Sequence, residues 1–147
     1  MKRGMPDFSS VVLDTFFRYM IPFVFVFGIY VLIHGEYSPG GGFQAGALLA
    51  FAVVLTRIVQ DEYCVIDMSG KTAFLFAAAG SLIFALIGIG AVFFGGNVLD
   101  YGAYPINLPP MELRPLGIVG IEVGVTLTVA GVIISIYDAF TRKDELR

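Results

Sequence analysis

The chain has 147 residues, of which 57% are hydrophobic and only 14% charged, and its mean hydropathy is +0.84. A water-soluble domain is about half apolar and about a quarter charged, so this composition predicts a single membrane domain over residues 1–147. The net charge is −3 with nine basic residues, which argues against a nucleic-acid partner because such proteins carry basic patches.

Four apolar stretches are long enough to cross a bilayer, which needs about 20 helical residues. They cover about residues 16–33, 43–59, 72–94 and 116–137. The sequence therefore predicts an all-α integral membrane protein with four transmembrane helices. Pro115 is expected to bound the fourth helix. The Pro-containing connection over residues 95–114 is expected to form a structured turn outside the membrane, with one short helical piece.

The basic residues predict the orientation of these helices. All of them except Arg114 lie near the start of the first stretch, after the fourth stretch, or beside the connection between the second and third. By the positive-inside rule, both termini should be cytoplasmic, and the protein should be a multi-pass protein of the cell membrane. Four acids in or near the inner connections are expected to be solvated: Asp61, Glu62, Asp67 and Asp138.

The connection between the first two predicted helices contains three consecutive glycines, Gly40, Gly41 and Gly42, preceded by Pro39 and followed by Phe43. Glycine costs backbone entropy on ordering and offers no side chain to bury. Such a run at a membrane edge indicates either a tight turn or backbone presented to something close. We expect Pro39 to fix the entry of the turn and Phe43 to anchor it against a neighbour.

Two titratable residues are candidates for chemistry. His34 ends the first predicted helix and is either an ordinary interface residue or a proton acceptor, because imidazole titrates near neutral pH. Glu122 is the one acid well inside a predicted helix, roughly 9 Å from its outer end at helical rise. An embedded acid costs about 2.5–3.5 kcal/mol on insertion scales and marks an ion path by default. Glu122 either lines such a path or, protonated, only holds a neighbouring helix.

Small residues form a stripe on the same predicted helix, within a sector of about 80° on a helical wheel. They are Gly117, Gly120, Gly124, Thr128, Gly131 and Ser135. Such stripes let membrane helices approach closely, and Glu122 lies roughly 150° from the centre of this one. The fourth helix should therefore have different neighbours on two sides. Four helices are hardly enough to enclose one of their own members, so we expect other membrane polypeptides to complete the enclosure.

These residues together resemble a known family, the B subunit (MnhB/MrpB-like) of Mrp-type multisubunit Na+/H+ antiporters. The counterparts of that subunit in membrane-bound hydrogenases and related respiratory complexes are also similar. The resemblance rests on His34-Gly35, on the run Ser38-Pro39-Gly40-Gly41-Gly42-Phe43, on the four-helix layout and on Glu122-Val123-Gly124-Val125. It covers about residues 16–137. Gln44-Ala45-Gly46 departs from the family's Ile/Gly-rich continuation, which leaves the parent complex open.

The resemblance implies a non-catalytic accessory subunit that binds other integral membrane subunits and membrane lipid. Larger antiporter-like partners would supply the Lys/Glu proton relays, since no lysine lies inside a predicted helix. Glu122, Thr126 and His34 would be ion-path or coupling residues, and no catalytic, cofactor-binding or metal-binding residue is expected. The alternative is a small homodimeric transporter in which Glu122 exchanges protons for a cation. The transported cation and its direction stay open.

Overall fold

The computed structural model describes residues 7–35, 41–59 and 70–145, and the described chain is helical with no strand. The helices are α1 (Asp7–Ile33), α2 (Gly42–Val59), α3 (Gly70–Phe93) and α4 (Pro110–Glu145), with a short 3-10 helix η1 (Tyr101–Ala103). Each long helix is apolar enough over 18 or more residues to cross a membrane. The prediction of an all-helical protein with four membrane-capable helices is confirmed.

The predicted bounds of α2 and α3 agree with the structure within two residues, but α1 and α4 are longer than predicted. The apolar stretch marks only the part of a helix that lipid covers, and both helices continue into polar flanks. The expectation that Pro115 bounds the fourth helix is wrong, because Pro115 lies inside α4. A proline this close to the helix start removes one N–H donor. Its usual acceptor would be the carbonyl of Met111, a residue that is 86% exposed and can be solvated.

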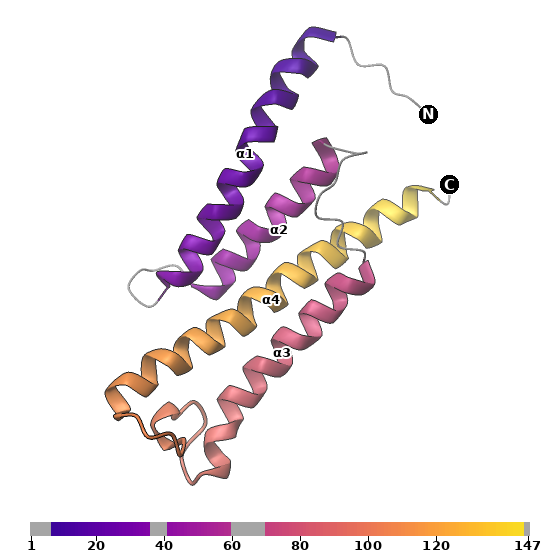
Figure 1. The fold of residues 1–147 in the computed structure, drawn as a ribbon. Coiled ribbons are helices and arrows are strands. Elements are labelled where there is room, and N and C mark those ends of the chain that lie inside the picture. Colours follow the sequence, from indigo (N-terminus) through magenta and orange to yellow (C-terminus); the bar gives the residue numbers. More distant parts are fainter. Residues whose placement is uncertain (1–6, 36–40, 60–69, 146–147) are drawn as a thin grey trace.

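The four helices lie side by side in a row in the order α1, α2, α4, α3 (Figure 1). α4 packs against both α2 and α3, whereas α3 makes no contact with α1 or α2 within the described residues. The start of α1, the end of α2, the start of α3 and the end of α4 lie along the same side of the row (Figure 1). This chain therefore supplies a neighbour for α4 on each of two sides, as the stripe and the acid predict. The expectation that other polypeptides complete the enclosure of α4 stays a prediction.

The stripe of small residues on α4 faces α3, as its pattern predicts. A Cβ atom on Gly124 would lie 2.9 Å from the carbonyl oxygen of Gly80, and one on Gly131 would lie 2.6 Å from the amide nitrogen of Ala77. The hydroxyl of Thr128 lies 3.4 Å from that of Ser81 on α3. Side chains larger than these would therefore push the two helix backbones apart.

The connection between α3 and α4 is fixed to both helices. The Tyr104 hydroxyl donates to the carbonyl of Ile87 at 2.8 Å, and its ring lies 5.5 Å from that of Phe94. Tyr101 in η1 packs against Gly117 of α4. Burial raises the pKa of Tyr101, and the neighbouring Tyr104 raises it further. The connection is structured and contains one short helical piece, as predicted, but it ends earlier than predicted because residues 110–114 belong to α4.

Candidate functional site

The carboxyl group of Glu122 lies against the glycines where α1 ends and α2 begins. A Cβ on Gly35 would lie 2.7 Å from Oε1 of Glu122, and one on Gly41 would lie 3.0 Å from the same atom. A Cβ on Gly42 would lie 3.0 Å from both the Cα and the carbonyl carbon of Glu122. The glycines therefore lack side chains because α4 occupies the space that those side chains would need. The structure thus joins the glycine run and the membrane acid, which the sequence presents as separate features.

Thr126, one turn after Glu122, connects the backbones of α4 and α2. Its side chain is buried, with 3% of its surface exposed. The hydroxyl lies within donating distance of two carbonyl oxygens, 3.0 Å from that of Gly42 and 2.8 Å from that of Glu122. Threonine often bonds the carbonyl four residues earlier in a helix, and here the same hydroxyl also reaches the neighbouring helix. Thr126 therefore sets the position of α4 relative to the first residue of α2.

A second small-residue spacing, on α2, makes this approach possible and is not among the predicted features. Gly42, Gly46 and Ala50 follow one another at intervals of four, and all three are buried. A Cβ on Gly46 would lie 2.7 Å from the carbonyl oxygen of Thr126. The spacing is a small-xxx-small pattern. It is detectable in the sequence, where it overlaps the end of the glycine run. That run was interpreted as a tight turn or as backbone presented to something close, and the second interpretation agrees with the contact of Gly42 and Gly46 with α4.

The environment of Glu122 contains two opposing electrostatic influences. Its Oε2 atom is buried from solvent although the residue as a whole is half-buried, and burial penalises an ionised carboxylate. The N-terminal end of α2 lies beside the same group, and a helix N-terminus stabilises negative charge. Burial and the end of α2 thus act on the charge of this carboxyl group in opposite directions.

The other predicted site residues have different positions. His34 is exposed, its ring is stacked on Tyr30 with centroids 4.0 Å apart, and its Nδ1 atom lies 3.1 Å from the Tyr30 carbonyl. Both of these contacts are with Tyr30 of α1, although the adjacent Gly35 lies against Glu122. Phe43 is 66% exposed in the first turn of α2 and is available to a neighbour. Pro39 and Gly40 lie outside the described residues.

A second polar contact joins α2 and α4 at the opposite end of their interface. Arg57 forms an ion pair and hydrogen bond with Asp138, and the two side chains are only 13% and 18% exposed. Oδ2 of Asp138 also lies beside Gly70, the first residue of α3. The expectation that Asp138 is solvated is therefore wrong, because tertiary packing brings it to a basic residue 81 positions away. Asp61, Glu62 and Asp67 lie outside the described residues.

Comparison with known proteins gives related sequences over nearly the whole chain. Residues 12–135 match the family described as "Domain related to MnhB subunit of Na+/H+ antiporter". A Staphylococcus haemolyticus protein named "Putative antiporter subunit mnhB2" is 33% identical over 129 residues, which cover 87% of this chain and 92% of that protein. A Na(+)/H(+) antiporter subunit of Bacillus subtilis is 27% identical over 137 residues, or 92% of this chain and 96% of that one. An uncharacterized protein of Methanocaldococcus jannaschii is 28% identical over 121 residues, which cover 80% of this chain but 46% of that longer protein.

Proposed function

The chain belongs to the family of domains related to the MnhB subunit of Na+/H+ antiporters, and from this we propose that it is a membrane subunit of a multisubunit Na+/H+ antiporter. In this role it is an accessory, non-catalytic subunit that supports ion translocation beside larger antiporter-like subunits. The protein is a transporter component rather than an enzyme. Its lysines are residues 2, 71 and 143, which leaves the helix interiors without the lysine of a Lys/Glu proton relay, so partners must supply that relay.

One observation carries the mechanistic part of this proposal, namely the contact of the Glu122 carboxyl with Gly35 and Gly41. Uptake of a proton by Glu122 removes a negative charge beside the N-terminus of α2 and weakens its attraction to that helix end. The packing between α4 and the glycine run can therefore respond to proton occupancy. Thr126 keeps the two backbones in register while this happens, because its hydroxyl bridges the Gly42 and Glu122 carbonyls.

Two exposed side chains near this contact can transmit the change in packing to a partner subunit. Phe43 directly follows the glycines and is 66% exposed, so a partner subunit can pack on it. His34 lies at the adjacent end of α1 and is exposed as well. We place the end of α1 and the start of α2 on the outer side of the cell membrane and both termini in the cytoplasm. The basis is the basic residues near the opposite ends of the helices.

The test is Glu122→Gln in the assembled complex, which keeps the shape of the side chain and removes its titration. We expect Na+-dependent proton release from everted vesicles to fall about tenfold, equivalent to about 1.4 kcal/mol of coupling, while the subunit still co-purifies with its partners. The matched control is Glu112→Gln, which neutralises an exposed acid in the first turn of α4 and should leave transport unchanged.

Two results would contradict this proposal. Equal loss of transport and of co-purification in Glu122→Gln would make the residue structural. Ion-coupled transport by the chain alone, reconstituted as a homodimer in liposomes, would show that no larger partner is needed.

A further inference from the structure

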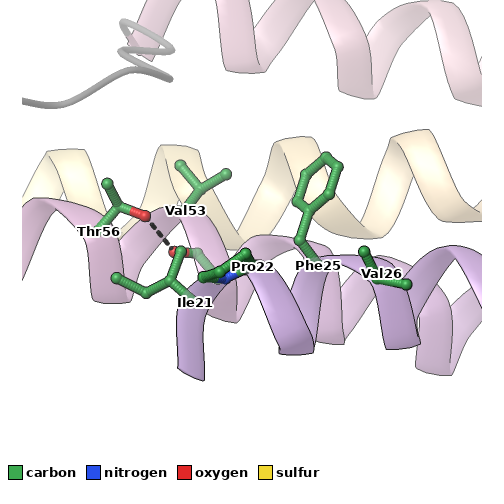
Figure 2. A pocket seen from close by; sticks show the side chains of 7 residues that line it. Ile21, Pro22, Phe25, Val26, Val53 and Thr56 are labelled. Atoms are coloured by element: carbon green, nitrogen blue, oxygen red, sulfur yellow. Dashed lines mark hydrogen bonds between the residues drawn. The ribbon is translucent and has the colours of Figure 1, made fainter. Parts of the chain in front are cut away.

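A wholly apolar groove of about 230 Å³ opens between α1 and α2 (Figure 2). α1 contributes Ile21, Pro22, Phe25 and Val26, and α2 contributes Ala52, Val53 and Thr56. The one hydroxyl among these side chains is turned into its own helix, since Thr56 donates to the Ala52 carbonyl at 2.8 Å (dashed line in Figure 2). The groove therefore offers no hydrogen-bonding group to an occupant and fits a hydrocarbon.

A cation lies on the same helical face, one turn before the groove begins. Arg18 precedes Ile21 and Pro22 by three and four residues, and side chains at these spacings are neighbours on a helix surface. From Ile33, the end of α1, Arg18 is 15 residues back, or about 22 Å at helical rise. In a hydrocarbon core about 30 Å thick, the guanidinium is then close enough to the far boundary to reach the phosphate layer by snorkelling.

The groove and Arg18 together decide which kind of occupant fits. A groove of about 230 Å³ lined by apolar side chains accommodates a segment of one acyl chain. Arg18, one turn away, is the group that an anionic headgroup on the same lipid would contact. We propose that this groove binds an acyl chain of an anionic phospholipid whose phosphate contacts Arg18.

The chemistry of arginine favours an anionic lipid over a zwitterionic one. A guanidinium forms paired hydrogen bonds to a phosphate, and its five N–H donors allow this in addition to the interaction that Arg18 already makes within the chain. A basic residue at a membrane surface contributes about 1 kcal/mol to binding anionic lipid. That value corresponds to about a fivefold preference for the anionic headgroup at equal mole fraction.

The absence of tryptophan from the chain provides a clean assay. Val26 lines the groove and is 65% exposed, so Val26→Trp places a single fluorophore at the rim. The full chain is reconstituted in bilayers containing acyl-brominated phosphatidylglycerol or phosphatidylcholine at equal mole fraction. We expect phosphatidylglycerol to associate with this rim tryptophan about five times more strongly, and Arg18→Gln to reduce the ratio to about one.

Two matched controls accompany this measurement. Leu82→Trp on α3 is exposed to a similar degree, at 60%, and both lipids should quench it equally. Lys71→Gln removes a different exposed cation and should leave the preference at the rim tryptophan intact, as should Arg18→Lys in large part. Equal quenching of the rim tryptophan by both lipids would overturn the proposal. So would quenching by neither lipid, which would mean that protein covers the groove.

Discussion

Replacing Gly42 by alanine tests the close approach of α2 and α4 directly. The added Cβ would lie 3.0 Å from the Cα and the carbonyl carbon of Glu122 and nearer still to its carbonyl oxygen, whereas ordinary contacts begin at 3.4 Å. All of these atoms belong to the backbone of α4, so no side chain can rotate away. The two helices must separate by at least 0.4 Å, the difference between 3.4 and 3.0 Å. The same movement stretches the 3.0 Å bond from the Thr126 hydroxyl to the Gly42 carbonyl.

The magnitude follows from three contributions. Overpacking costs about 1–3 kcal/mol, and the weakened hydrogen bond costs about 0.5–1.5 kcal/mol. Against this, alanine stabilises a helix interior by up to about 1 kcal/mol relative to glycine. The gain is smaller at Gly42 because this residue is the first of α2. We expect the free energy of unfolding to fall by about 2 kcal/mol.

The assay is reversible unfolding of the full chain in mixed micelles by increasing SDS, followed by far-ultraviolet circular dichroism. The control is Gly120→Ala on α4, whose added Cβ would meet only the side chain of Ile87, with the terminal Cδ1 nearest at 2.7 Å. That side chain can change rotamer, so this variant should be neutral or slightly stabilised. A Gly42→Ala protein as stable as the unmodified one would refute the claim that α4 excludes a side chain at this position.

Two further predictions concern contacts away from the glycines. Arg57→Asp or Asp138→Arg alone should lower the free energy of unfolding by up to about 3 kcal/mol, because each leaves one charge partly buried without its counterpart. The double exchange should recover most of this loss in the same SDS titration. A double variant no more stable than the single ones would contradict the pairing. The raised pKa of Tyr101 favours the neutral phenol in the folded protein, so its contribution to stability is complete below pH 10.0, the ordinary value, and is lost as the pH rises through the folded-state pKa. Tyr101→Phe should therefore lose less stability between about pH 8 and about pH 11 than the unmodified chain, and identical losses would show that this phenol plays no part.

The helices themselves were predictable because hydropathy over about 20 residues reports directly on membrane burial. The ends of α4 were not, because Pro110 and Glu145 lie in polar flanks where helix formation depends on local backbone geometry. Glu122 was identifiable as a candidate site residue from its cost in lipid. Its contact with Gly35 and Gly41 was not, because those residues are more than 80 positions away in the chain, and only tertiary packing brings them together.

The neighbours of α4 were predictable only in number, for a related reason. The stripe ending at Ser135 and the acid on the opposite side correctly indicated two neighbours for this helix. Which helices these are depends on their spatial order, and α4 lies between α2 and α3 although it follows both in the chain. The pairing of Arg57 with Asp138 depends on the same order, because it needs α2 and α4 to be adjacent.

The position of α4 in the row has a consequence for how the protein is made. Among the described elements, α3 touches neither α1 nor α2, and α4 contacts both groups. Because α4 is the last helix in the chain, α3 can join the pair formed by α1 and α2 only after α4 has been synthesised and has taken its place between α2 and α3.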